Sequence, residues 1–194
     1  MATPYPESLD RLSSAIIALR DTLNELEVPH TFIGGVALAA TGRPRMTHDV
    51  DVLVMLGKTT LRSLLEKAKR HGIVPRISDA ESFAAQHHVL LLLHEQSAIP
   101  IEVALGSLSF EKETIARSQE IHIEGLRFRA PLPEDLIVMK AVAHRPQDME
   151  DIRAIVAVNP NLDRERVIHW IREFSEALEA PDLVAEVEHL LKQA

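Results

Sequence analysis

The sequence predicts an α+β protein, with a mixed β-sheet flanked by helices and a C-terminal helical region. Short apolar or alternating segments typical of strands are spread between residues 30 and 128. From Pro133 onward these strand signals vanish, and apolar residues recur at helical spacing instead. We therefore expect residues 1–132 to form an α/β core with an N-terminal helix, and residues 133–194 to form a helical region packed on that core.

The order of the elements follows from the apolar spacing and from glycine and proline breaks. Apolar residues at helical spacing predict a first helix over residues 8–28. A short strand over 30–33 is then broken by Gly34 and Gly35 before a short helix over 36–41. The remaining elements are expected at 50–54 (strand), 59–71 (helix), 73–77 (strand), 88–94 and 99–105 (hairpin), 109–118 (helix), 121–123 and 126–128 (hairpin), and 133–143, 147–158, 163–178 and 181–192 (helices).

Composition excludes several classes of site and partner. The chain has no cysteine, so disulfides and thiolate metal sites are excluded, and oxygen ligands favour a hard cation such as Mg²⁺. A net charge of -8 argues against broad electrostatic binding of nucleic acid. The N-terminal residues show no basic leader with an apolar core, and no apolar run approaches the roughly 20 residues of a membrane span. We expect a cytoplasmic protein with no membrane partner.

Asp49 and Asp51 are the first candidate site. Residues two apart on a strand point to the same side, so both carboxylates should face one point in space. A divalent cation would neutralise their repulsion, and carboxylates with substrate phosphate oxygens are common ligands of Mg²⁺. A solvent-facing strand with two hydrated aspartates explains the pair equally well. The pair alone therefore leaves a metal site open.

Three further features favour a site, and each has an ordinary structural explanation. Gly34 and Gly35, between a strand and a helix, permit close approach of a phosphate to backbone N–H groups, or form a plain tight turn. Glu102 interrupts an apolar strand and can complete a metal triad if that strand neighbours the aspartates, or serves as an edge-strand charge. Lys140 and Asp148 place a cation and a carboxylate near a helix junction, where Asp148 can also serve the helix dipole.

These motifs, in this order and spacing, resemble the polymerase-beta-type nucleotidyltransferase superfamily. The resemblance covers residues 30 to 155 and rests on four segments: 32–38, 45–53, 101–103, and Lys140 with 145–152. Within the superfamily the sequence is most similar to the AbiEii/MenT-like group, which comprises nucleotidyltransferase toxins of toxin–antitoxin systems and uncharacterised relatives. Two departures are Gly35, where many transferases have serine, and Glu102, where aspartate is more usual.

The resemblance implies a nucleotidyltransferase-like core and a metal-dependent active site. It implies that Asp49, Asp51 and Glu102 hold one or two Mg²⁺ ions, and that Lys140 is catalytic with them. A nucleoside triphosphate would be the substrate. Its binding residues would be Gly34, Gly35, Arg45, Thr47, Lys140 and Asp148.

The implied reaction moves a nucleotide from the triphosphate to an acceptor, either RNA such as tRNA or a protein. By the same resemblance the chain would be a toxin with an antitoxin partner. A different hypothesis is a non-catalytic module of the same fold that binds a nucleotide or a partner. In a third, residues 160–194 form a helical module that docks a partner such as an antitoxin, alongside whatever the cleft does.

Overall fold

A computed structural model describes residues 6–41, 47–123 and 125–192 of the chain. A five-stranded sheet in the order β1-β2-β5-β4-β3 forms its centre, and β6 pairs with β7 in a second sheet. Only the β2–β5 pairing is parallel in the main sheet, so the sheet is mixed, as predicted. The strands are β1 (His30–Ile33), β2 (Val50–Val54), β3 (Ile73–Pro75), β4 (Val89–His94), β5 (Ile99–Leu105), β6 (Gln119–Ile123) and β7 (Leu126–Ala130).

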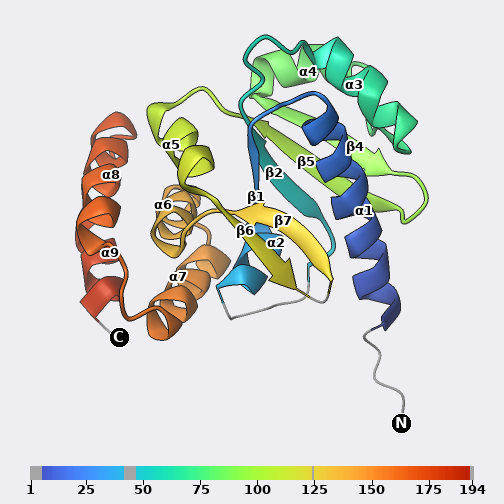
Figure 1. Ribbon diagram of the computed structural model, residues 1–194. Helices are drawn as coiled ribbons and strands as arrows, with labels where there is room; N and C mark the ends of the chain where they lie inside the picture. The colour runs from blue at the N-terminus through green and yellow to red at the C-terminus, as the bar shows by residue number, and fades with distance from the viewer. Residues whose placement is uncertain (1–5, 42–46, 124, 193–194) are drawn as a thin grey trace.

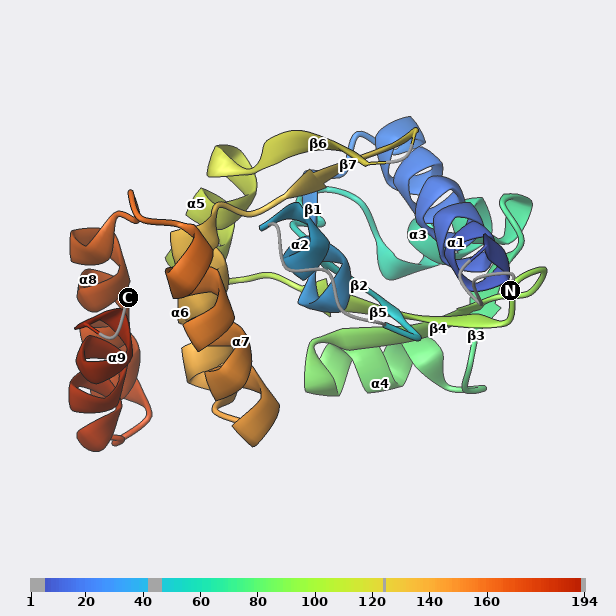
Figure 2. The ribbon, with the colours of Figure 1, turned by 90° about the horizontal axis from the view of Figure 1, so that it is seen from below.

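Helices cover both faces of the main sheet and one end of the molecule. In Figures 1 and 2, α1 and α3 lie on one side of the strands and α4 on the other, while α6 to α9 form a separate layer at the end of the molecule. The prediction of an α+β fold is thus confirmed. The helices are α1 (Pro6–Glu25), α2 (Gly34–Ala40), α3 (Leu61–Arg70), α4 (Ala80–His87), α5 (Ser109–Arg117), α6 (Pro133–Ala143), α7 (Pro146–Val158), α8 (Arg164–Ala177) and α9 (Asp182–Lys192).

The structure differs from the sequence prediction mainly around α4 and at the starts of α2 and β2. Helix α4 was not predicted, because only two of its residues, Ala80 and Ala84, are buried and its apolar periodicity is weak. His88 does not begin the next strand; it ends α4 with φ +55°, and β4 starts one residue later. Gly34 and Gly35 form the first turn of α2 instead of a break before it, and Asp49 lies in a bend just ahead of β2.

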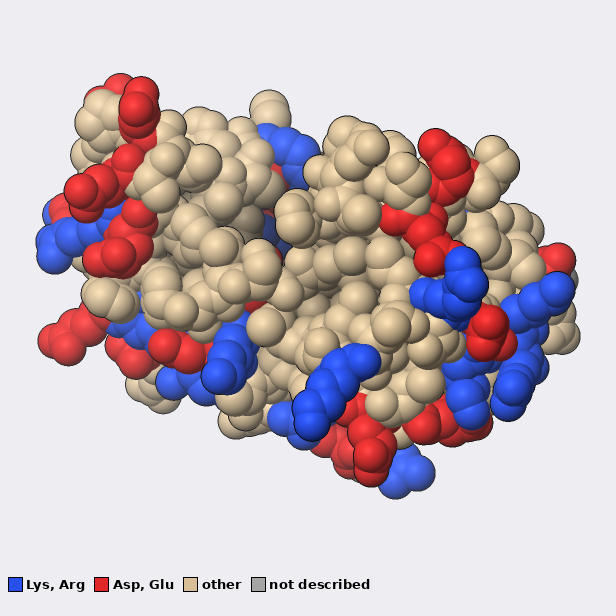
Figure 3. Space-filling model, turned by 90° about the horizontal axis from the view of Figure 1, so that it is seen from above, with Lys and Arg blue, Asp and Glu red and all other residues tan. Residues whose placement is uncertain are grey.

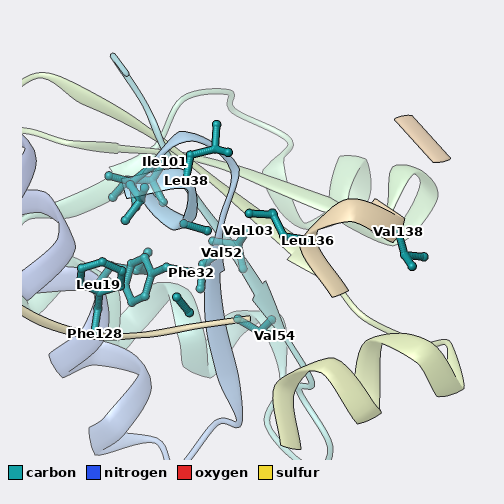
Figure 4. Packing of buried hydrophobic residues seen from close by; sticks show 14 of the residues in the cluster. Leu19, Phe32, Leu38, Val52, Val54, Ile101, Val103, Phe128, Leu136 and Val138 are labelled. Carbon is teal, nitrogen blue, oxygen red and sulfur yellow. The ribbon is translucent and has the colours of Figure 1, made fainter. Parts of the chain in front are cut away.

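The core joins α1, the main sheet and the small sheet. Leu19 of α1, Phe32 of β1 and Phe128 of β7 are buried and lie next to one another in Figure 4. The Phe32 and Phe128 rings meet edge to face with centroids 5.8 Å apart, a geometry that aromatic pairs favour. This contact fixes β7 against β1, the edge strand of the main sheet.

The C-terminal helices are tied to the core by buried ion pairs. Asp135 of α6 is fully buried and accepts hydrogen bonds from Arg166 Nε of α8 at 2.6 Å and from Arg117 Nε of α5 at 3.3 Å. Two guanidinium groups on one buried carboxylate compensate its lost hydration. The network links α5 with α6 and α8 across residue 132, and the predicted domain boundary there stays a prediction.

The surface is mixed in charge. On the face seen in Figure 3, acidic and basic side chains form small separate groups around a largely uncharged centre. Within the described part of the chain, no helix is both long and apolar enough to cross a membrane.

Candidate active site

The parallel pairing of β2 with β5 places two of the predicted acids side by side. Asp51 of β2 lies directly opposite Glu102 of β5, so the condition that their strands be neighbours is met. Asp49 stands two residues before Asp51, and its carboxylate Oδ1 accepts a hydrogen bond of 2.7 Å from Thr47 Oγ1. Thr47 thus fixes the orientation of Asp49 ahead of the strand.

The three carboxylates share one electrostatic environment. Burial, together with the negative charges of Asp49 and Glu102, raises the pKa of Asp51 to about 6, although Arg145 and Lys140 act in the opposite direction. An oxygen-only donor set under mutual repulsion fits a hard divalent cation, which would relieve that repulsion. In the part of the chain that is described, no three histidine, aspartate or glutamate side chains are gathered as a ready metal centre.

Glu102 has a competing partner. Arg76, on the segment after β3, approaches the Glu102 carboxylate with an Nη1–Oε1 distance of 3.6 Å. Both side chains are partly exposed, so the pair contributes little to stability. A cation held by all three acids would therefore share Glu102 with Arg76 or displace the guanidinium.

The two glycines leave room for the acids. Gly34 has φ +59°, and a Cβ atom placed on it would lie 1.9 Å from Asp51 Oδ2. A Cβ atom on Gly35 would lie 2.5 Å from Thr47 Oγ1. Side chains at these two positions would therefore collide with Asp51 and Thr47, and the first turn of α2 can pack against the site only because both residues are glycine.

Replacing Gly34 with alanine is expected to damage the fold and the site together. The new Cβ collides with the Asp51 carboxylate, and a left-handed backbone adds strain, for a combined loss of about 1–3 kcal/mol in the free energy of unfolding. Urea denaturation measures this loss. Gly57, also at positive φ but with no atom near its added Cβ, is the matched control, and Gly57→Ala should lose only the smaller backbone part. Equal losses would contradict the steric explanation.

Lys140 lies in a buried ion-pair cluster. Its side chain is 6% exposed, and Nζ donates to Asp151 Oδ2 at 2.6 Å and to Asp148 Oδ1 at 3.1 Å. Burial alone would raise the pKa of Asp148, but hydrogen bonds from Arg145 and Lys140 outweigh it and hold that pKa below its ordinary value. Lys140 is thus committed to two carboxylates, and Asp148 in turn is committed to two cations.

Arg145 is the exposed member of this cluster. Its side chain is 73% exposed, and its Nε donates to Asp148 Oδ2 at 2.6 Å while Nη2 donates to Oδ1 at 3.2 Å. Its charge lowers the pKa of Asp51, which places the guanidinium within the electrostatic reach of the acids. Asp148 therefore holds a solvent-accessible cation beside the site.

Comparison with known proteins identifies the family. Residues 7–189 match the family model described as nucleotidyltransferase of unknown function (DUF6036). The chain belongs to this nucleotidyltransferase family. A search of curated proteins finds no match. The superfamily inferred from the sequence is confirmed, whereas membership of the AbiEii/MenT-like group is not.

Solved structures place this nucleotidyltransferase in the same fold. An antigenic nucleotidyltransferase-like protein from Paracoccidioides brasiliensis has 17% identity and a TM-score of 0.55, with 93% of this chain and 94% of that chain covered. The antibiotic-resistance factor ANT(2″)-Ia in solution has 16% identity and a TM-score of 0.60, with 88% and 95% covered. ANT(2″)-Ia in complex with adenylyl-2″-tobramycin has 14% identity and a TM-score of 0.51, with 94% and 98% covered.

The nucleotidyltransferase brings most of the predicted residues together and adds two that the sequence analysis missed. Arg45 lies outside the described residues. Arg76 was not among the predicted site residues because it lies in no recognisable motif. Arg145 lay inside a motif segment, three residues before Asp148, and that spacing is a signal for a side-chain bond at a helix start. The functional roles of all these residues stay predictions.

Proposed function

We propose that this chain is a metal-dependent nucleotidyltransferase that moves a nucleotide from a nucleoside triphosphate to a hydroxyl group. The observation that carries the proposal is the facing position of Asp51 and Glu102 on adjacent parallel strands, with Asp49 two residues before Asp51. Family membership supports the same reaction class. Catalysis of such transfers is mainly positioning and stabilisation of charge on the phosphates.

Asp49, Asp51 and Glu102 would hold one or two Mg²⁺ ions. When bound, the metal would neutralise charge on the reacting phosphate and leaving pyrophosphate. Asp49, Asp51 and Glu102 supply only oxygen donors, in agreement with the ligand preference of Mg²⁺. Asp51 or Glu102 would accept the proton of the attacking hydroxyl.

Arg145, more than Lys140, is suited to hold the triphosphate. A guanidinium can bind phosphate oxygens through several N–H groups, and Arg145 is exposed while anchored on one side by Asp148. Lys140 would act as a positioning residue that keeps Asp148 charged and in place. Gly34, Gly35 and Thr47 would keep the nucleotide side of the site open and orient Asp49.

The acceptor and the biological setting are the finer part of the proposal. RNA such as tRNA, or a protein hydroxyl, would be the acceptor in an AbiEii/MenT-like toxin, and an antitoxin would then be its partner, with α8 and α9 as the docking region. ANT(2″)-Ia is seen with adenylyl-2″-tobramycin, so an aminoglycoside hydroxyl is a further acceptor to test. The alternative is a non-catalytic module that binds a nucleotide or a partner through the same residues.

The test is a transfer assay with each labelled nucleoside triphosphate, Mg²⁺, and total RNA, total protein or tobramycin as acceptor. The wild type should label one acceptor, and Asp49→Asn/Asp51→Asn should lose at least about a hundredfold in rate. Glu150→Gln, at an exposed position of α7 where Glu150 pairs with Arg153, is the matched control and should keep full activity.

Three outcomes distinguish the hypotheses. Transfer activity that persists in the double variant would contradict the assignment of Asp49 and Asp51 as metal ligands. Metal-dependent nucleotide binding without transfer to any acceptor would favour the binding module. Loss of transfer in the Glu150→Gln control would show that the assay reports folding and not the site.

A further inference from the structure

Arg76 reaches the acids from the far edge of the main sheet. The strand order puts β4 between β3 and β5, and the three strands lie side by side in Figure 2. Glu102 of β5 is in register with Leu91 of β4, and the amide of Arg76, just after β3, donates to the Leu91 carbonyl at 3.0 Å. Because neighbouring strands lie about 4.8 Å apart, the backbones at Arg76 and Glu102 are separated by about 10 Å. The two long side chains therefore meet above β4.

This meeting point lies on the side of Glu102 that faces away from Asp51. Asp51 flanks Glu102 on β2, and Leu91 flanks it on β4. The Oε1 atom of Glu102 is 3.6 Å from Nη1 of Arg76. The ion pair thus draws the Glu102 carboxylate toward β4 and β3, away from the carboxylate of Asp51.

Two observations agree with a third acid that is turned aside. Burial raises the pKa of Asp51 most and the charge of Asp49 comes next, whereas Glu102 contributes less than either, although it lies directly opposite Asp51. Among the residues that the structure describes, no three acidic or histidine side chains are gathered closely enough to hold a metal ion. Glu102 is therefore in register with the site while its carboxylate is engaged elsewhere.

The length of the Glu102 side chain makes two positions possible. An aspartate here would be one methylene shorter, and its carboxylate would stay above β5. Glutamate has one more rotatable bond, so its carboxylate can turn toward Arg76 or toward Asp49 and Asp51. It cannot serve both sides equally, because the guanidinium and a divalent ion repel each other.

We propose that Arg76 is a positioning residue that holds Glu102 away from the metal site, so that the acid triad is complete only when Glu102 turns from Arg76 toward Asp49 and Asp51. This inference rests on the proposed function, since it takes the three acids as metal ligands. Arg76 would lower the affinity of the site for divalent ions and would set the Mg²⁺ concentration at which the triad forms. The pair is partly exposed, so its expected effect is a factor of about two to five in affinity.

The experiment measures Mn²⁺ binding to the whole chain by calorimetry, with Mn²⁺ as a probe that accepts the same oxygen ligands as Mg²⁺. Arg76→Gln should bind Mn²⁺ about two- to fivefold more tightly than the wild type. Arg62→Gln is the matched control, because Arg62 forms a similarly loose pair with Glu81, at 3.8 Å, and its replacement removes the same charge. The control should keep the affinity of the wild type.

A second background makes the test specific to the Arg76–Glu102 contact. In Glu102→Asp the carboxylate can still bind metal but is too short to reach Arg76, so adding Arg76→Gln should not tighten Mn²⁺ binding further. A general effect of removing positive charge would instead tighten binding equally with Glu102 or aspartate at this position. In the transfer assay, Arg76→Gln should lower the Mg²⁺ concentration for half-maximal rate without changing the KM for the triphosphate.

The outcomes distinguish an error in this inference from an error in the proposed function. If the wild type does not bind Mn²⁺, or if Asp49→Asn/Asp51→Asn binds it equally well, the proposed metal site is wrong and the role of Arg76 falls with it. If the double variant loses Mn²⁺ binding but Arg76→Gln binds no more tightly than the wild type, only the role of Arg76 is wrong. Equal tightening in the Glu102→Asp background would also overturn that role.

Discussion

Replacing Asp51 with asparagine is expected to abolish nucleotidyl transfer and, without divalent cations, to stabilise the fold. Asp51 is partly buried between Asp49 and Glu102, and its pKa is raised from 3.8 to about 6. A folded-state pKa above the unfolded value means that the folded chain binds a proton more tightly, so stability falls as pH rises through 6. The ionised Asp51 thus costs about 2–3 kcal/mol at pH 8 before solvent screening. Asparagine keeps the shape and removes that cost.

Urea denaturation in EDTA at pH 8 and pH 4 measures the effect. The asparagine variant should exceed the wild type by about 1–3 kcal/mol at pH 8, and the difference should shrink toward pH 4, where Asp51 is protonated in the folded chain and close to half protonated in the unfolded chain. Adding Mg²⁺ should then stabilise the wild type more than the variant. A variant that is less stable at pH 8, or that gains as much from Mg²⁺, would contradict the assignment of Asp51 as a repelled metal ligand.

Replacing Lys140 with methionine is expected to destabilise the fold strongly. The substitution leaves Asp148 and Asp151 buried with fewer cations, and breaking a buried pair costs about 3–5 kcal/mol. Adding Asp151→Asn to Lys140→Met should recover part of the loss, because one buried negative charge is then removed. Thermal or urea unfolding of the single and double variants checks this result. A stable Lys140→Met variant would show that the cluster contributes little.

Arg145→Gln tests whether this arginine acts on the nucleotide or only on the stability of the fold. Asp148 keeps Lys140 as a partner when Arg145 is replaced, so this substitution should cost less stability than Lys140→Met. The main effect of the Arg145 substitution should be a higher KM for the triphosphate. A Lys140 variant that folds normally and alters only KM would instead return the phosphate-binding role to Lys140.

The strands of the sheet could be predicted because their apolar patterns are strong. β1, β2 and β5 carry continuous or alternating buried residues, and their predicted ranges agree closely with the structure. Helix α4 could not be found, since its sequence buries only two alanines and offers no clear helical stripe. A weak pattern of this kind becomes a helix through its contacts with β4, which a single sequence does not reveal.

The candidate site, like the fold, could be predicted from the sequence only in part. Asp51 and Glu102 stand out because charges interrupt apolar strands, and the structure places these two residues in register. Asp49 stands out by its position two residues before Asp51, although it lies in a bend ahead of the strand. The direction of a long flexible side chain is not encoded in spacing. Lys140 turns inward to two carboxylates, while Arg145 remains exposed, and only the packing of α6 against α7 decides which cation faces the site.

The absent side chain at Gly34 ties two distant positions of the sequence together. Any residue with a Cβ there would occupy the space of the Asp51 carboxylate, so neither position can change freely while the other is kept. Related sequences that carry a larger residue at the position of Gly34 should have a shorter or displaced residue at the position of Asp51. Substitutions at these two positions should therefore be inherited as a pair, and an intact glycine becomes a marker of relatives that still hold the acid in place.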